Sequence, residues 1–419
     1  MGYYARVLDF TCMIEIKFLS VRRRAALFIL TGLHLLAGCA TTPFVVPSVE
    51  QAPFIGRAIV ETQQTVRVAA AVPDAEETRN LIGVDLYAKG IQPVWLQVTN
   101  LGEASVYAAL HSIDDEYFSP LEVAWKFRGW FSKQGRADME RWFYENQMPR
   151  RIPPGETRSG FVFTHIAKGS KAFNFDAYSS GRSFNFTFVV PMPGFFADYM
   201  EVDFEAVYDE DEIRVVDLNG LREALITYPC CSTNESGEAG DPINVVVVAQ
   251  ERALGLALLR AEWEETPAND PETAVARTHR HLGRRPDGTF HKARPDGSER
   301  KELRLWLAPL LLGEQKVWVG QVSYELQRAT GKQGFKNYRI DPEIDNARLY
   351  LLQNFWYTQS LAALGYVRGV PPATFDAPSR NFADARYFTD GKRVVLFLSE
   401  TPVAMDETDV LPWERMVVE

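Results

Sequence analysis

The sequence predicts an α+β protein that has two folded regions behind a short targeting segment. Three observations support this fold class: one brief apolar run near the amino terminus, alternating strand patterns up to about residue 225, and strands interleaved with helices after it. The 419 residues are enough for two or three separate cores. A net charge of -10 opposes attraction of the whole protein to nucleic acid, so we expect no nucleic-acid partner.

The apolar run covers residues 25–36 and directly follows three arginines, Arg22 to Arg24. A helix that rises ~1.5 Å per residue needs ~20 apolar residues to cross a bilayer, so this run is too short to span one. Positive residues, a short apolar core and then small residues are typical of a secretory signal peptide. We therefore expect residues 1–38 to be removed, and we interpret Met13 or Val21 as the true translation start.

At the end of the apolar run lie four residues, Leu36-Ala37-Gly38-Cys39, that resemble the lipobox of bacterial lipoproteins. The resemblance implies that the lipoprotein signal peptidase recognises Leu36, Ala37 and Gly38, and that Cys39 is lipidated, with palmitate as a typical acyl chain. Several acyl chains anchor a protein stably, whereas one chain holds it only marginally. By the same resemblance, the alanine after the cysteine favours the outer membrane over the inner. We expect a lipid-anchored, periplasm-facing protein of the cell envelope, with a linker over residues 39–54.

Strand patterns dominate residues 55–225, the first predicted domain. Apolar and polar residues alternate over 94–99, 184–188 and 202–206, and a fourth strand over 159–164 follows a Pro-Pro-Gly turn. Each such sheet must cover its apolar face with another layer. We therefore predict an N-terminal immunoglobulin-like β-sandwich.

A helical insertion interrupts these strands. Ser119 followed by Pro120 is typical of a helix start, and the aromatic-rich stretch Val123–Phe143 comes directly after it. These aromatic residues form either a surface for a ligand or membrane, or the core of a helix pair that packs on the sandwich. Packing is the more common role of such a stripe, so we favour it.

Residues 226–400, the second predicted domain, alternate between strands and helices. The patterns place, in order, a strand over 245–248, a helix over 250–265, a hairpin over 303–326, a helix from Asp341 to near Gly365 and a strand over 393–399. This order matches the split βαβ arrangement of ferredoxin-like α+β folds. Residues 401–419 are expected to form a C-terminal tail.

Four blocks of this second region resemble the LssY C-terminal domain family. They are GDPINVVVVA, RLWLAPLLLGEQKVWVGQVS, IDPEIDNARLYLLQNFWYTQSLAALGYVRGV and TDGKRVVLFLS, and they occur in this order between about residues 225 and 398. The resemblance implies little chemistry, because these domains have no defined activity and are often attached to integral-membrane proteins similar to lipid phosphatases. The chain has no Pro-Ser-Gly-His block, the signature of that phosphatase partner. It therefore looks like the accessory domain without the enzyme.

The loop before the hairpin contains candidates for a metal site and for an anion-binding site. Three histidines there have a spacing that suits zinc binding, and a zinc ion would support metal-assisted hydrolysis. The competing interpretation is an exposed basic loop. We favour no metal site. Nine Lys or Arg stand against four acids between residues 277 and 304, and arginine binds phosphate bidentately, although a solvated loop is more common. The weak metal candidates are His279, His281 and His291, and the candidate anion-binding residues are Arg284, Arg285, Lys292, Arg294 and Arg304.

The remaining polar features have structural explanations. The acidic run 209–212 lacks the spaced ligands of a calcium loop and is predicted to be a solvated turn. The group Asp341, Asp345 and Arg348 suits the start of a helix. The adjacent pair Cys230-Cys231 can bridge only through a strained, readily reduced ring.

The sequence thus favours a non-catalytic binding or accessory module with no cofactor, and a metal- or phosphate-dependent hydrolase that uses the 279–304 loop is the alternative. No nucleophile-base motif or phosphate loop stands out, so no catalytic residue is predicted. The expected partners are the membrane, through the lipid anchor, and an envelope protein, a lipid headgroup or a glycan.

Overall fold

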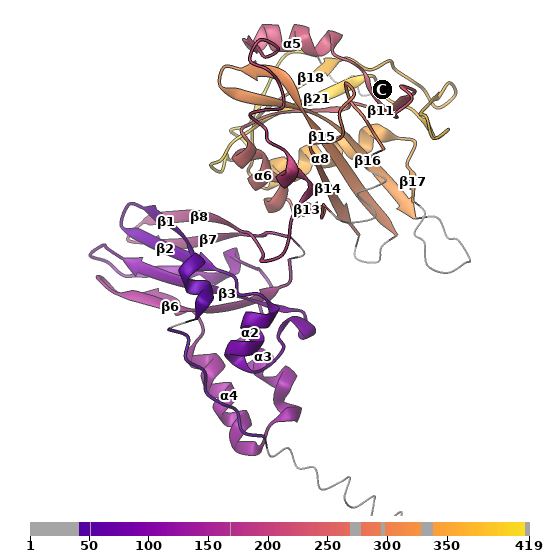
Figure 1. The fold of residues 1–419 in the computed structure, drawn as a ribbon. Helices are drawn as coiled ribbons and strands as arrows, with labels where there is room; N and C mark the ends of the chain where they lie inside the picture. Colours follow the sequence, from indigo (N-terminus) through magenta and orange to yellow (C-terminus); the bar gives the residue numbers. More distant parts are fainter. Residues whose placement is uncertain are drawn as a thin grey trace, which may run out of the picture. The chain divides into compact units, whose positions relative to one another are not determined.

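The structure is a computed structural model that describes residues 42–50, 52–167, 169–268, 278–294, 298–327 and 338–414. The chain divides into two compact units, Met1–Ser105 with Asp115–His165 and Val106–Asp114 with Ile166–Glu419. Both units contain strands and helices, so the chain is α+β, as predicted (Figure 1). The predicted signal peptide, the lipobox-like stretch and Cys39 lie outside the described residues.

The first unit combines an antiparallel sheet of order β1-β2-β3-β6 with a pair of helices. Trp95 of β3 pairs with Phe161 of β6, and the predicted strands over 94–99 and 159–164 are confirmed as parts of these two strands. The elements of this unit are η1 (Pro53–Arg57), β1 (Ile59–Gln63), β2 (Val66–Ala71), α2 (Ala75–Ile82), η2 (Tyr87–Lys89), β3 (Ile91–Asn100), α3 (Pro120–Phe127), η4 (Arg128–Trp130), α4 (Lys133–Glu145), β5 (Arg151–Ile152) and β6 (Thr157–His165).

The helix pair begins where the sequence predicts. The Ser119 hydroxyl accepts a hydrogen bond from the backbone N–H of Glu122 at 3.2 Å, and α3 starts at Pro120. One face of the pair packs on the sheet in a core that includes Val123, Phe127, Met139, Trp142, Phe143, Trp95 and Phe161. Packing is therefore confirmed for most of the aromatic stretch, but Trp125 and Trp130 are exposed.

The second unit opens with a smaller antiparallel arrangement in which β7 lies between β4 and β8. The predicted strand over 184–188 is confirmed within β8, and its three phenylalanines are buried on one face. The elements of this part are β4 (Val106–Ala109), η3 (Leu110–Ser112), β7 (Lys171–Ser179), β8 (Arg182–Val190) and η5 (Asp198–Glu201).

The prediction of a strand over 202–206 is wrong. This stretch is a series of turns, because the Asp203 carboxylate accepts a hydrogen bond from the backbone N–H of Glu205 at 3.2 Å and the Asp203 carbonyl accepts one from the N–H of Ala206 at 3.1 Å. Phe204 is held by an edge-to-face contact with Trp318, with ring centroids 5.1 Å apart. The acidic run 209–212 is also a turn, as predicted.

A large mixed sheet organises the rest of the second unit. Its strands lie in the order β13-β14-β15-β16-β12-β21-β18-β22, so β12 is central, as predicted for residues 245–248. β12 is antiparallel to β16 and parallel to β21. The elements are β9 (Arg214–Val216), α5 (Leu218–Thr227), β10 (Cys231–Thr233), β11 (Ala239–Pro242), β12 (Val245–Val248), α6 (Glu251–Arg260), β13 (Glu264–Glu265), β14 (Gly288–Ala293), β15 (Glu299–Leu312), β16 (Gln315–Gln327), β17 (Tyr338–Ile340), α8 (Ile344–Tyr357), β18 (Leu361–Arg368), β19 (Ser379–Arg380), β20 (Arg386–Tyr387), β21 (Lys392–Leu398) and β22 (Asp409–Val410).

Helices cover both faces of this sheet. On one face α6 and α8 join a core with Val245, Leu305 and Trp318; on the other, α5 joins Val246 and Trp306. Within the described part of the chain, no helix is both long and apolar enough to cross a membrane.

The predicted second helix of this region ends too late. α8 stops at Tyr357, the chain turns through Gln359 at a positive φ of 56°, and residues 361–368 form β18 instead of more helix. The helix also begins later, at Ile344 after Glu343, while the Asp341 carboxylate accepts a hydrogen bond from the Glu343 N–H at 3.0 Å. Leu361, Leu364 and Val367 are buried, and the sequence of β18 has no polar–apolar alternation to separate it from a helix.

Candidate functional site

An apolar cavity of about 320 Å³ lies beside α6 in the second unit. α6 forms one wall, and strands β14 to β16 form another, because the helix packs its apolar face on the sheet. The lining residues include Leu254, Gly255, Leu259, Phe204, Phe290, Leu305 and Trp318. A volume of this size is within the range of small-molecule sites, which span roughly 300–1,000 Å³ and are mostly apolar.

Gly255 keeps part of this space open. It is an interior residue of α6, and a Cβ built on it would meet no atom within 4 Å. Glycine in a helix interior is destabilising relative to alanine, so its use here costs stability and leaves room beside the sheet.

One end of the cavity is polar. Glu265 is buried, and its carboxylate accepts hydrogen bonds from the backbone N–H of Ser170 at 2.6 Å and from the Tyr199 hydroxyl. Burial and the Glu265 carboxylate raise the pKa of Tyr199, so the phenol stays protonated and donates. Gly169 leaves the space that the Glu265 carboxylate occupies, since any Cβ there would clash with it. The cavity thus has a fixed polar group, Glu265 with Tyr199, in a mostly apolar wall that also includes Glu251, Arg252 and Asp287.

A second buried polar group lies on the sheet itself. The cross-strand pairs Arg300–Glu325, Glu302–Ser323 and Arg304–Gln321 of β15 and β16 form three successive rungs on one face. We call these six residues the polar ladder. Arg300 contacts Glu325 at 2.6 Å and Glu302 at 3.1 Å, and Arg304 contacts Glu302 at 2.5 Å.

The two carboxyl groups of the polar ladder differ in charge. Burial and the neighbouring Glu302 carboxylate raise the pKa of Glu325 to about 8, so this group is mostly protonated at neutral pH. Burial opposes ionisation of Glu302 too, but Arg304 and its other partners hold the pKa of Glu302 below its usual range. At neutral pH the polar ladder therefore holds one ionised carboxylate, Glu302, beside two arginines, and Glu325 keeps its proton.

The three histidines of the metal hypothesis have separate partners. His279 bonds to the Ser232 hydroxyl at 3.2 Å, His281 donates through Nδ1 to the Cys231 carbonyl at 3.3 Å, and His291 lies 3.1 Å from the Glu264 carboxylate. Burial lowers the pKa of His279 to about 3 and that of His281 to about 4, so both are neutral. In the part of the chain that the structure describes, no three His, Cys, Asp or Glu side chains are grouped to hold a metal.

The candidate anion-binding residues do not converge on one another. Arg284 pairs with Asp287, Lys292 with Glu262 at 3.2 Å, and Arg294 with Glu299. Arg304 is buried in the polar ladder, and Arg285 is exposed. Most of the loop's positive charge is therefore used within the fold.

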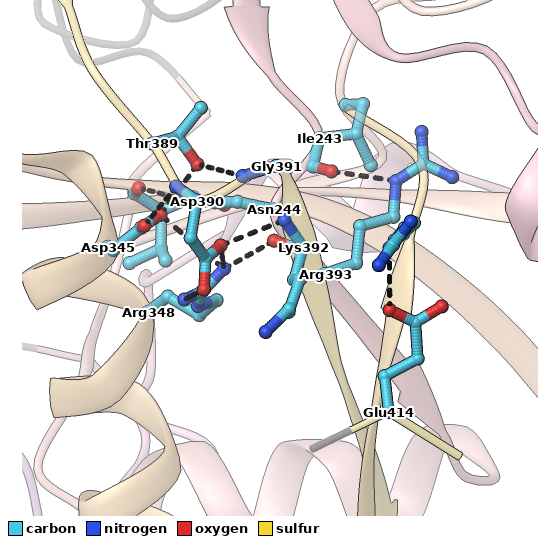
Figure 2. Close-up of polar contacts among 12 residues, drawn as sticks. Ile243, Asn244, Asp345, Arg348, Thr389, Asp390, Gly391, Lys392, Arg393 and Glu414 are labelled. Atoms are coloured by element: carbon cyan, nitrogen blue, oxygen red, sulfur yellow. Dashed lines mark hydrogen bonds and ion pairs between the residues drawn. The ribbon is translucent and has the colours of Figure 1, made fainter. Parts of the chain in front are cut away.

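Asp345 and Arg348, which the sequence predicts to lie at a helix start, connect α8 to the turn that precedes β21. Figure 2 shows Arg348 of α8 between Asp345 and Asp390, with both Arg348 terminal nitrogens on the Asp390 carboxylate at 2.9 and 3.1 Å. Asp345 accepts hydrogen bonds from Thr389 and from the Asp390 N–H at 2.8 and 2.7 Å (Figure 2). These contacts support the structural interpretation.

Cys230 and Cys231 are joined by a disulfide. The pair lies at the start of β10, where the Cys230 carbonyl accepts a hydrogen bond from the Ile243 N–H at 2.7 Å.

Sequence reasoning missed both the cavity and the polar ladder. The cavity has one sequence signal, the glycine inside an otherwise apolar helix. The polar ladder has another, the alternation of Arg300, Glu302 and Arg304 along one strand, which is also the pattern of an ordinary solvent-exposed face.

The comparisons with known proteins identify one region. The family model described as the LssY C-terminus matches residues 223–392. No curated protein matches the chain significantly. The match covers α6, most of the cavity wall and the polar ladder.

Proposed function

Residues 223–392 form an LssY C-terminal-like domain, and from this premise we propose that the chain is a lipid-anchored cell-envelope protein whose LssY-like domain is a non-catalytic module that binds an apolar ligand. The observation that carries the proposal is the cavity beside α6. Its walls are mostly leucine and aromatic side chains, and apolar surface removed from water contributes roughly 25 cal/mol per Å² to binding. An alkyl or acyl chain is the ligand class that such walls fit.

The lipid anchor is a proposal from the sequence. Leu36, Ala37 and Gly38 before Cys39 support cleavage and lipidation there, and Ala40 favours the outer membrane. The envelope location and the periplasmic orientation depend on this anchor.

We also propose the finer fold assignments. The antiparallel sheet of order β1-β2-β3-β6 supports an immunoglobulin-like arrangement for the first region. The succession β12, α6, β15, β16, α8, β18, with β16 antiparallel beside β12, supports a ferredoxin-like core into which β21 is inserted.

Cavity binding is tested by filling the space at Gly255. The Gly255→Phe variant places a ring where the wild-type chain has open space, and we expect it to weaken binding of the fluorescent probe cis-parinaric acid at least about tenfold, because the ring takes the volume that the probe needs. Gly56→Phe is the matched control, since its Cβ also meets no atom within 4 Å and it does not line the cavity. Equal binding by wild type and Gly255→Phe would reject the cavity as the site.

The anchor is tested separately by metabolic labelling with palmitate. Wild-type protein should incorporate the label and Cys39→Ala should not, because in the proposal the acyl chains are attached only at Cys39, through diacylglycerol on its thiol and by acylation of the amino group that cleavage exposes. Equal labelling of both would remove the anchor and leave the cavity proposal intact.

A further inference from the structure

The corner between α3 and α4 in the first unit exposes two tryptophans. Trp125 is 53% exposed and Trp130 is 57% exposed, whereas Phe127 and Trp142 of the same helix pair are buried. Leu121 precedes Trp125 by one helical turn on the same face of α3 and is also exposed. We call the exposed Leu121, Trp125 and Trp130 the tryptophan corner. Exposed apolar surface of this kind usually marks an interaction site.

Basic residues lie close in sequence to the tryptophan corner. Lys126, Arg128, Lys133 and Arg136 fall within residues 123–137, and this stretch contains no acid in a protein of net charge -10. The Arg128 guanidinium lies 5.9 Å from the Trp125 ring. Two acids flank the stretch, Glu122 at 3.8 Å from Lys126 and Asp138 at its other end. Aromatic and basic side chains side by side are the combination that the headgroup region of an anionic bilayer attracts.

The described chain begins against this same corner. The Thr42 carbonyl accepts a hydrogen bond from the Ser132 N–H at 3.0 Å, and the Phe44 ring packs edge-to-face on Phe131 at 5.7 Å. Figure 1 shows the opening indigo segment beside α4. Val45 and Val46, which follow at once, are 79% and 66% exposed.

The covalent distance to the proposed anchor is short. Three peptide units separate Cys39 from Thr42, and at 3.8 Å per Cα–Cα step they reach at most about 11 Å. A lipid on Cys39 would therefore hold the bilayer surface close to the residues that flank Thr42, which include Ser132 and the end of η4 at Trp130.

We propose that the tryptophan corner and its basic neighbours form a docking surface for the anionic bilayer into which the lipid on Cys39 inserts. The inference rests on the proposed anchor. Trp125 and Trp130 enter the headgroup region with their indole N–H groups hydrated, and Lys126 and Arg128 neutralise lipid phosphates. Docking fixes the orientation of the first unit on the membrane, which a lipid anchor alone does not do.

The test uses the full-length, lipidated protein in vesicles of phosphatidylcholine with phosphatidylglycerol, in which bromine on the acyl chains quenches nearby tryptophan. Trp125 and Trp130 are two of nine tryptophans, so we expect brominated lipid to remove up to roughly two ninths of the emission. Trp125→Ser with Trp130→Ser should abolish this loss, and Lys126→Glu with Arg128→Glu should reduce it several-fold. Leu101→Ser, at an exposed apolar residue of another loop, should leave it unchanged.

The outcomes separate docking from anchoring. If wild-type protein incorporates palmitate at Cys39 but its emission is the same in brominated and ordinary vesicles, the docking surface is wrong and the anchor stands. Quenching that persists in the double tryptophan variant also overturns it if Gly255→Phe, which fills the cavity lined by Trp318, does not remove that quenching, because tryptophans outside the corner and the cavity then carry the signal. If Cys39→Ala labels like wild type, the anchor itself fails.

Discussion

Glu302 of β15 and Glu325 of β16 are buried on one face of the large sheet, and the Arg300 side chain contacts both, at 3.1 and 2.6 Å. Two carboxyl groups so close in a buried site do not both ionise at neutral pH. The pKa of Glu325 is raised to about 8, whereas that of Glu302 is lowered. The protonated Glu325 is therefore part of the folded state.

Glu325→Gln should remove a pH dependence of stability. A carboxyl group whose folded pKa is raised binds its proton more tightly in the folded state, so its stabilising effect is complete below its unfolded pKa of about 4.5 and is lost as the pH rises towards 8. Between pH 5 and 8 the wild type should lose stability relative to Glu325→Gln by up to about 1.4 kcal/mol per pH unit. Urea unfolding at several pH values measures this difference.

Two buried histidines change the stability with pH in the opposite direction, and their contribution cancels when the wild type is compared with Glu325→Gln. The lowered pKa values of His279 and His281 destabilise the fold as the pH falls below about 6.5, in both proteins alike. Glu314→Gln, in the exposed turn of the β15–β16 hairpin, is the control and should parallel the wild type. Parallel curves for wild type and Glu325→Gln would contradict the assigned proton.

Arg393→Lys should unfold the second unit readily. Arg393 is fully buried on β21, and its guanidinium donates to five backbone carbonyls, those of Leu225, Tyr228, Pro229, Ile243 and Gly369, at 2.6 to 2.9 Å (Figure 2 shows the bond to Ile243). Burial lowers the pKa of Arg393 to about 10 without discharging it at neutral pH. A lysine ammonium lacks the planar fork that reaches these carbonyls, so we expect a loss of roughly 3 kcal/mol by urea unfolding.

The control for Arg393 is Arg368→Lys. The Arg368 side chain is 79% exposed and pairs with Glu414 at 3.0 Å. An exposed pair contributes at most about 1 kcal/mol, so this substitution should change stability little. Similar losses in the two variants would show that the carbonyl contacts of Arg393 are unimportant.

Asn244→Leu should loosen the central strand β12. The buried Asn244 amide accepts from the Val322 N–H and donates to the Val322 carbonyl, both at 3.0 Å, so it extends the pairing with β16 by one rung. Leucine keeps the volume but leaves two buried backbone groups unpaired, at about 1–3 kcal/mol each. Hydrogen exchange of the Val322 amide should accelerate, whereas Asn185→Leu, at an exposed position of β8, should leave it protected.

Elements with a strong local signal could be predicted from the sequence. The Ser119-Pro120 start places α3 correctly, and the apolar run 245–248 identifies the central strand, because both signals act within a few residues. Residues 202–206 alternate like a strand but form turns. The turn at Asp203 depends on a side-chain hydrogen bond, which the alternation of apolar and polar residues does not predict.

The sites depend on contacts between distant segments. The alternating polar residues of β15, Arg300, Glu302 and Arg304, have the sequence pattern of a solvent-exposed face. Only their pairing with Glu325 and Gln321 of β16 shows that this face of the strand is buried as well. Glu265 receives its hydrogen bonds from Ser170 and Tyr199, which lie 95 and 66 residues earlier in the chain. No local pattern reports such pairings.

Gly255→Ala should stabilise the second unit. Glycine in a helix interior is less favourable than alanine by roughly 0.5–1 kcal/mol, and the added methyl group at this position meets no atom within 4 Å, so nothing offsets the gain. Thermal unfolding should show a higher midpoint for the variant.

Gly160→Ala is the contrasting control, because a Cβ on Gly160 would lie 2.5 Å from the backbone of Gln147 and must destabilise the first unit. A destabilised Gly255→Ala would mean that the backbone of α6, and not the open space beside it, requires the glycine. If alanine stabilises the helix while Gly255→Phe abolishes probe binding, the chain accepts a weaker helix at this position for the sake of the volume, as expected when a cavity serves a ligand.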